Sequence, residues 1–154
     1  MNAKTLKLLV IQAHNREEAA LQALRATQGK LRRATALQQQ LEDFGQEYRQ
    51  AALDAQRSGG RVGFAMDALA FGQRLHSTAG EQRPVIADHT ALRDQQQRQA
   101  SALQYRREGL EKLLQAALRQ EQRQADRQAQ KELDDVINAR CLPGAGMNAA
   151  VKTR

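Results

Sequence analysis

The chain has 154 residues and a formal net charge of +7, and aromatic residues make up only 3% of it. Its 41% of hydrophobic residues include many alanines and no tryptophan, which is too little bulk for a compact globular core. Gln, Arg, Ala and Leu fill most of the sequence and favour helices, whereas strand-forming residues are scarce. The composition therefore predicts an extended all-α protein.

The positive charge is spread evenly along the chain. Residues 1–57 carry nine Lys or Arg against six Asp or Glu, and residues 58–140 carry thirteen against eleven. The local cluster of Lys30, Arg32 and Arg33 is typical of a solvated helix face. We therefore predict no specific nucleic-acid partner.

The first predicted helix covers residues 3–57 and carries a heptad seam, meaning a row of residues that face a second helix. From Ala34 onwards the apolar spacing predicts a three-residue insertion, which overwinds a coiled coil locally. This continuation places Phe44 and Tyr48 on the seam, and we predict that both rings pack between the helices. The seam is Leu6, Val10, Ala13, Glu17, Ala20, Leu24, Thr27, Leu31 and Ala34, followed by Leu37, Leu41, Phe44, Tyr48, Ala51 and Ala55.

A glycine-rich turn over residues 58–63 and a second helix over residues 64–140 follow. Pro84 is expected to kink or locally break this helix at residues 80–84. A short turn between two helices makes them antiparallel, so we predict a long antiparallel two-helix coiled-coil hairpin. The second seam is predicted at Met66, Leu69, Leu75, Ile86, His89, Leu92, Leu103, Leu110, Leu113 and Ala117.

The two predicted helices differ in length. At about 1.5 Å per residue they extend roughly 80 and 115 Å, so the second helix is expected to overhang. Ala125 and Ala129 are the only apolar residues of Arg119–Glu132. Such a polar segment can extend into water without a partner helix, as the overhanging part of the second helix must. Residues 141–154 contain Pro and Gly without periodicity and are predicted to be a disordered tail.

The sequence shows no motif that groups catalytic or metal-binding residues. Cys141 is the only cysteine, and His14, His76 and His89 lack the spacing of metal ligands. The apolar run Leu8–Ile11 is too short for a signal peptide or a membrane span, which predicts a cytoplasmic protein. We expect no catalytic residues, no metal and no cofactor, and hence a protein that is not an enzyme.

The sequence on both sides of the turn resembles a known family. The stretches "LQQQLEDFGQEYRQAAL" and "FAMDALAFGQRLHSTAGEQ", with a second helix rich in Gln and Arg, are similar to the FliJ family of flagellar export proteins. The resemblance covers about Ala3 to Arg140, and its markers are the Leu41, Phe44 and Tyr48 spacing and the Phe71 and Leu75 pair. Helix-weakening residues at Gly45, Gly72, Gly80 and Pro84 depart from the family pattern.

This resemblance implies a stalk-like hairpin, similar to the γ subunit of rotary ATPases, in the flagellar type III export apparatus. The implied partners are the export ATPase hexamer, the FlhA-type export gate and export chaperones, with the membrane reached only through these partners. By the resemblance, Phe71 and Leu75 contact the gate, while Leu41, Phe44 and Tyr48 pack the hairpin end or contact a partner. On the stalk analogy, the ATPase-facing pole carries Arg119, Arg123, Arg127 and Lys131.

Two other functions stay open at this point. The stalk of a virulence injectisome shares the hairpin pattern. A basic coiled-coil adaptor for nucleic acid agrees with the isoelectric point near 10.2, although the even distribution of charge disfavours it.

Overall fold

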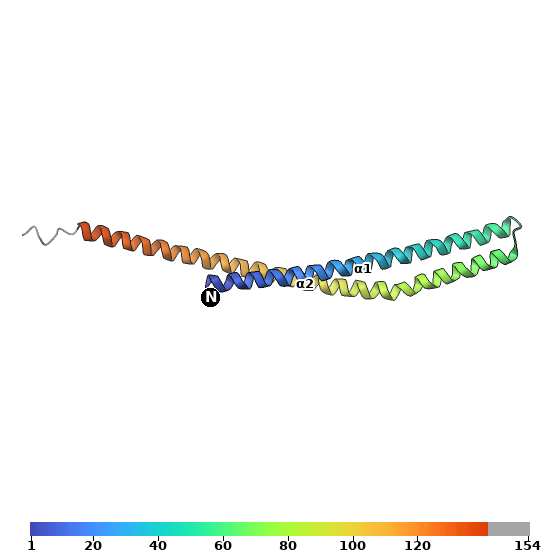
Figure 1. The fold of residues 1–154 in the computed structure, drawn as a ribbon, viewed down its shortest axis with the longest axis horizontal. Coiled ribbons are helices and arrows are strands. Elements are labelled where there is room, and N and C mark those ends of the chain that lie inside the picture. Colours follow the sequence, from blue (N-terminus) through green and yellow to red (C-terminus); the bar gives the residue numbers. More distant parts are fainter. Residues whose placement is uncertain (142–154) are drawn as a thin grey trace, which may run out of the picture. The chain divides into compact units, whose positions relative to one another are not determined.

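The computed structural model describes residues 1–141, which form two α-helices and no strand. Helix α1 spans Ala3–Arg57 and helix α2 spans Val62–Cys141 (Figure 1). The predicted all-α hairpin is therefore confirmed, with α2 beginning two residues earlier than the predicted residue 64. The tail predicted for residues 141–154 lies outside the described residues, apart from Cys141 at the end of α2.

The chain divides into two units. The hairpin unit comprises residues 12–107, and the terminal unit combines residues 1–11 with the chain from Glu108 onwards. In the hairpin unit, α1 and α2 run antiparallel on either side of the turn (Figure 1).

The turn ends α1 through its backbone hydrogen bonds. Gly59 has a φ of 72°, a left-handed conformation that a residue with a Cβ rarely adopts. This conformation lets the Gly60 N–H donate to the Ala55 carbonyl at 2.8 Å, while the Ser58 N–H donates to the Asp54 carbonyl at 3.0 Å. The Gly60 bond, with Gly59 left-handed before it, is the six-to-one bond of a Schellman motif, whereas the Ser58 bond is an ordinary helical one; both satisfy carbonyls near the helix end. The glycines of the sequence therefore stop α1 and reverse the chain.

The seam of α1 in the hairpin unit follows an unbroken heptad. Ala13, Glu17, Leu24, Thr27 and Ala34 are buried, as predicted. The predicted three-residue insertion after Ala34 is wrong, because the least exposed positions continue in steps of four and three. These positions are Gln38, Leu41, Gly45, Ala52 and Ala55, with Tyr48 completing the spacing.

Two of the predicted seam residues of α1 lie beside the seam instead. Leu37 is 44% exposed and Phe44 is 51% exposed, whereas their neighbours Gln38 and Gly45 face α2. The predicted packing of Phe44 between the helices is therefore wrong. Gly45, next to Phe44, faces α2 instead, because the backbones of the two helices come too close there for a large side chain.

The seam of α2 is also a regular heptad, but mostly of small and polar residues. The prediction is confirmed at Leu75, Ile86, His89 and Leu103, which are all half-buried. It is wrong at Met66, Leu69 and Leu92, which are exposed because the preceding or following residue faces α1 instead. The observed positions are Ala65, Ala68, Gly72, Leu75, Ala79, Gln82, Ile86, His89, Arg93, Gln96, Ala100, Leu103 and Arg107.

The two helices approach each other most closely at Gly45 and Gly72. A Cβ added to Gly72 would lie 3.0 Å from the Gly45 carbonyl oxygen, and one added to Gly45 would lie 3.3 Å from the Gly72 carbonyl oxygen. The Cβ atoms of Tyr48 and Leu75 lie beside the same contact. These glycines weaken the helices locally but permit backbone contact between them, which explains their place on the seam.

We expect Gly72→Ala to lower the free energy of unfolding by about 1 kcal/mol. The added methyl group gains about 1 kcal/mol of helix propensity but forces two backbones apart, and such overpacking costs typically 1–3 kcal/mol. Gly29→Ala is the matched control, because nothing lies within 4 Å of its added Cβ. That control should gain about 1 kcal/mol. Urea unfolding of both variants measures the difference, and equal gains would contradict the close contact.

Pro84 does not break α2. The helix is continuous from Val62 to Cys141 with Pro84 inside it, and the proline ring is exposed. The predicted break is therefore wrong. A proline inside a helix removes one backbone hydrogen bond and can bend the helix. In Figure 1, α2 changes direction in its yellow-green part, which agrees with the other prediction, a kink.

The terminal unit begins with a capped helix and contains the most solvated part of α2. The Lys4 N–H donates to the Asn2 side-chain oxygen at 3.0 Å, which caps α1, and Ala3 and Leu6 are buried. Leu110 and Ala117 of α2 are half-buried, as predicted, whereas Leu113 is 55% exposed and was assigned to the seam wrongly. Every residue of 118–141 is exposed, as the sequence of Arg119–Glu132 suggested.

Candidate partner-binding surface

Four of the five aromatic side chains of the hairpin unit, Phe44, Tyr48, Phe64 and Phe71, lie close to the turn and are exposed, whereas the exposed Tyr105 lies far from it. The rings of Tyr48 on α1 and Phe71 on α2 meet edge to face, with centroids 4.7 Å apart and an interplanar angle of 76°. The Arg74 guanidinium lies 5.9 Å from the Phe71 ring centroid. Despite these contacts, Tyr48 and Phe71 are each 41% exposed. We call Phe44, Tyr48 and Phe71 the aromatic edge.

A shallow hollow lies within the aromatic edge on α1. Its volume is about 300 Å³, and its lining residues are Phe44, Glu47, Tyr48 and Ala51. Two rings and a methyl group give it an apolar wall, while Glu47 adds a carboxylate. Concave apolar surface beside exposed rings is typical of a site for a partner's side chain.

The predicted gate-binding pair, Phe71 and Leu75, divides between two roles in the structure. Phe71 belongs to the exposed aromatic edge. Leu75 is half-buried on the seam, beside the backbone contact at Gly45. Leu41 is also half-buried on the seam. Leu75 and Leu41 therefore contribute to the packing of the hairpin, whereas Phe71 is exposed.

The predicted ATPase-facing residues form a row on α2 in the terminal unit. Arg119, Arg123, Arg127 and Lys131 follow one another at four-residue intervals and are all exposed. Side-chain hydrogen bonds from glutamine to acidic residues run along the same segment, including Gln122 to Asp126 at 2.8 Å. Such i,i+4 pairs stabilise a helix whose side chains are solvated.

A buried ion pair links the two helices of the hairpin unit. The Arg107 guanidinium donates a hydrogen bond to the Glu17 carboxylate, across 90 positions of sequence. Only 21% of the Arg107 side chain and 12% of the Glu17 side chain are exposed. The heptad spacing predicted Glu17 on the seam, but the partner was missed because an arginine among many gives no distinguishing signal.

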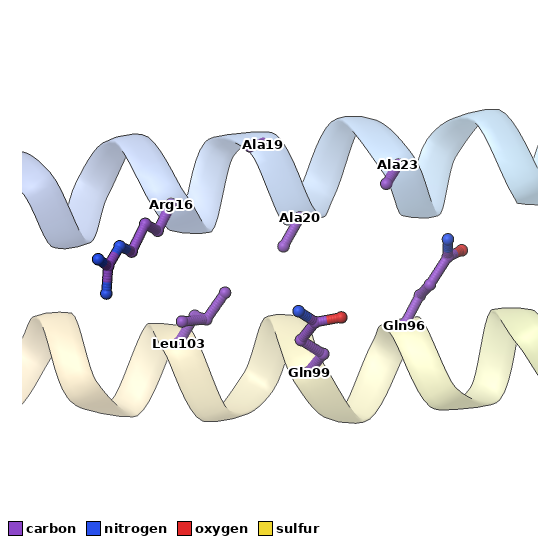
Figure 2. Close-up of a pocket in the computed structure, with 7 residues that line it drawn as sticks. All are labelled: Arg16, Ala19, Ala20, Ala23, Gln96, Gln99 and Leu103. Carbon is purple, nitrogen blue, oxygen red and sulfur yellow. The ribbon is translucent and has the colours of Figure 1, made fainter.

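A larger hollow lies between the helices towards the end of the hairpin unit that is away from the turn. Its volume is about 400 Å³, and Figure 2 shows side chains from both helices around it. The side-chain oxygen of Gln96 is buried and lacks a hydrogen-bond partner. The lining residues are Arg16, Ala19, Ala20, Ala23, Gln96, Gln99 and Leu103.

Within residues 1–141, no group of three or more His, Cys, Asp or Glu side chains is placed to hold a metal ion. In the same range, neither helix is apolar enough over a sufficient length to cross a membrane.

The two long antiparallel helices and the exposed aromatic edge place the chain in the class of coiled-coil hairpin proteins. The chain belongs to the FliJ family, because the family model described as flagellar FliJ protein matches residues 2–142. Members of this family are non-enzymatic components of the flagellar protein export apparatus. No curated protein and no solved structure matches the chain significantly.

Proposed function

We propose that this protein is the stalk-like component of the export apparatus that binds the export ATPase hexamer and the FlhA-type export gate. In this role it promotes assembly of the ATPase ring and couples ATP hydrolysis to export. Family membership supports the setting, and the exposed aromatic edge is the observation that supports partner binding. The protein works in the cytoplasm and reaches the membrane only through its partners, with export chaperones as further ligands.

The aromatic edge is the proposed contact for the export gate. Phe71 and Phe44 are large, partly exposed side chains, and the Tyr48 ring packs edge to face against the Phe71 ring. A ring that is already ordered loses little conformational entropy when a partner covers it. Large aromatic anchors of this kind contribute much of the binding energy at protein interfaces.

The row from Arg119 to Lys131 is the proposed contact for the ATPase. Positive side chains at successive turns of one helix suit several weak electrostatic contacts with a ring, since each exposed charge pair contributes little alone. Because residues 118–141 are exposed in the terminal unit, the contact requires no opening of the hairpin unit.

Deletion of residues 119–140 tests the ATPase contact. We expect the shortened protein to lose binding to the ATPase in a pull-down and to stop stimulating ATP hydrolysis. The thermal unfolding of the hairpin unit should stay unchanged, because the deleted residues lack buried side chains. Replacing the four basic residues with glutamine is the matched variant that keeps the helix length. Full stimulation by both variants would contradict the assignment.

A further inference from the structure

The hollow in the aromatic edge contains a carboxylate without a partner. Phe44, Tyr48 and Ala51 form its apolar wall, and Glu47 lies among them on the same helix. Within residues 1–141, the Glu47 carboxylate takes part in no ion pair and accepts no hydrogen bond. The hollow therefore combines aromatic surface with a negative charge that the chain itself does not neutralise.

The helix faces that carry the exposed rings are rich in acidic residues, although the whole chain has a net charge of +7. Side chains three, four or seven residues apart share one face of a helix. This spacing links Phe44 to two acidic residues of α1, and Phe71 to one acidic and one basic residue of α2. Charge complementarity therefore favours a basic group of a partner at the aromatic edge. The four charged residues are Glu47, Asp54, Asp67 and Arg74, and all are exposed.

The one basic residue shows how a guanidinium fits this surface. The Arg74 guanidinium carbon lies 5.9 Å from the Phe71 ring centroid, within the range of cation–π attraction. A planar guanidinium can stack on an aromatic ring and also donate paired hydrogen bonds to a carboxylate, which the compact ammonium group of lysine cannot do. The hollow offers both kinds of contact, because the Phe44 and Tyr48 rings lie beside Glu47.

We infer that the hollow at Glu47 receives an arginine side chain of the export gate. Its volume of about 300 Å³ has room for one long side chain. The aliphatic part of the arginine packs against Phe44 and Ala51, its guanidinium lies against the Tyr48 ring, and the Glu47 carboxylate accepts its hydrogen bonds. This inference rests on the proposed gate contact and adds the chemical group that the gate must supply.

Glu47→Gln tests the ion pair in the full-length protein. Glutamine keeps the size of the side chain but removes its charge, so we expect affinity for the purified cytoplasmic part of the export gate to fall about ten-fold. Thermal unfolding should match the wild type, because Glu47 is exposed. Asp88→Asn is the matched control, since it removes one negative charge from an exposed position of α2 well beyond the aromatic edge. This control should bind like the wild type in isothermal titration calorimetry.

The Phe71→Ala variant separates this inference from the proposed gate contact. If Glu47→Gln binds the gate like the wild type while Phe71→Ala loses affinity, the arginine contact is wrong and the gate contact stands. If both variants bind like the wild type, the aromatic edge is not the gate contact and both ideas are wrong.

Nuclear magnetic resonance of the gate domain with isotopically labelled arginine identifies the partner group directly. We expect the side-chain Nε–H signal of one arginine to shift when the wild-type protein is added, and to shift far less with Glu47→Gln at the same bound fraction. Gate binding without a shift of any arginine side-chain signal would overturn the inference. Absence of gate binding by the wild type would overturn the proposed gate contact together with it.

Discussion

Replacing Arg107 with alanine is expected to lower the free energy of unfolding by roughly 3 kcal/mol. The substitution leaves the Glu17 carboxylate between two helices with only 12% of its side chain exposed. A buried charge that loses its partner typically costs about 3–5 kcal/mol, and the lower end applies because water reaches part of this pair. Urea unfolding followed by circular dichroism measures the loss.

The double variant Glu17→Leu with Arg107→Leu distinguishes the cost of an unpaired buried charge from the cost of changing the two seam residues. Both charges are then absent and two leucines occupy seam positions, so stability should return close to that of the wild type or rise above it. Arg107→Lys keeps the charge and should lose less than alanine. If Arg107→Ala unfolds like the wild type, the pair contributes nothing and the account of this contact is wrong.

The second large effect is expected for Phe71→Ala. Loss of this ring should weaken binding to the cytoplasmic part of the export gate by about 2 kcal/mol or more, which is roughly 30-fold in the dissociation constant. Because Phe71 is 41% exposed, the midpoint of thermal unfolding should change little. Isothermal titration calorimetry with the purified gate domain measures the affinity.

Met66→Ala and Leu75→Ala are the controls for this result. Met66 is 65% exposed and lies outside the aromatic edge, so its removal should leave gate binding unchanged. Leu75 lies on the seam, and its truncation should lower stability more than binding. Normal gate binding by a folded Phe71→Ala protein would show that the ring is not the anchor.

The sequence predicted the first part of the hairpin well. From Ala13 to Ala34 the predicted heptad positions coincide with the buried positions of α1, so spacing finds the seam there even though few of its residues are large and apolar. Beyond Ala34, the largest apolar residues stand one position beside the seam. Spacing then favours Leu37 and Phe44, and the correct positions, Gln38 and Gly45, give no hydrophobic signal.

The seam of α2 was harder to predict for the same physical reason. Alanine and glycine let helices approach closely, but they occur on exposed faces equally often in an alanine-rich chain. Polar seam residues such as Gln82 and Arg93 resemble any solvated position. The contact of Gly45 with Gly72 therefore became visible only from the arrangement of the two backbones.

The candidate site was predicted in part. The family resemblance assigned Phe71 to a surface that contacts a partner, and Phe71 is exposed. Sequence did not show that Tyr48 and Phe71 touch, because side-chain contact between helices depends on their register. The predicted place of Leu75 on the seam is confirmed, whereas its contact with a partner stays a prediction. The assignment of these residues to the export gate stays a prediction.

Swimming motility in a strain that lacks this gene tests the central claim most directly. The account predicts that the deletion strain does not swim, that the wild-type and Met66→Ala genes restore swimming, and that Phe71→Ala does not restore it. Protein levels and thermal unfolding of each variant show whether the fold is kept. A deletion strain that swims normally, or full rescue by Phe71→Ala together with Phe44→Ala, would contradict a role in flagellar export through the aromatic edge.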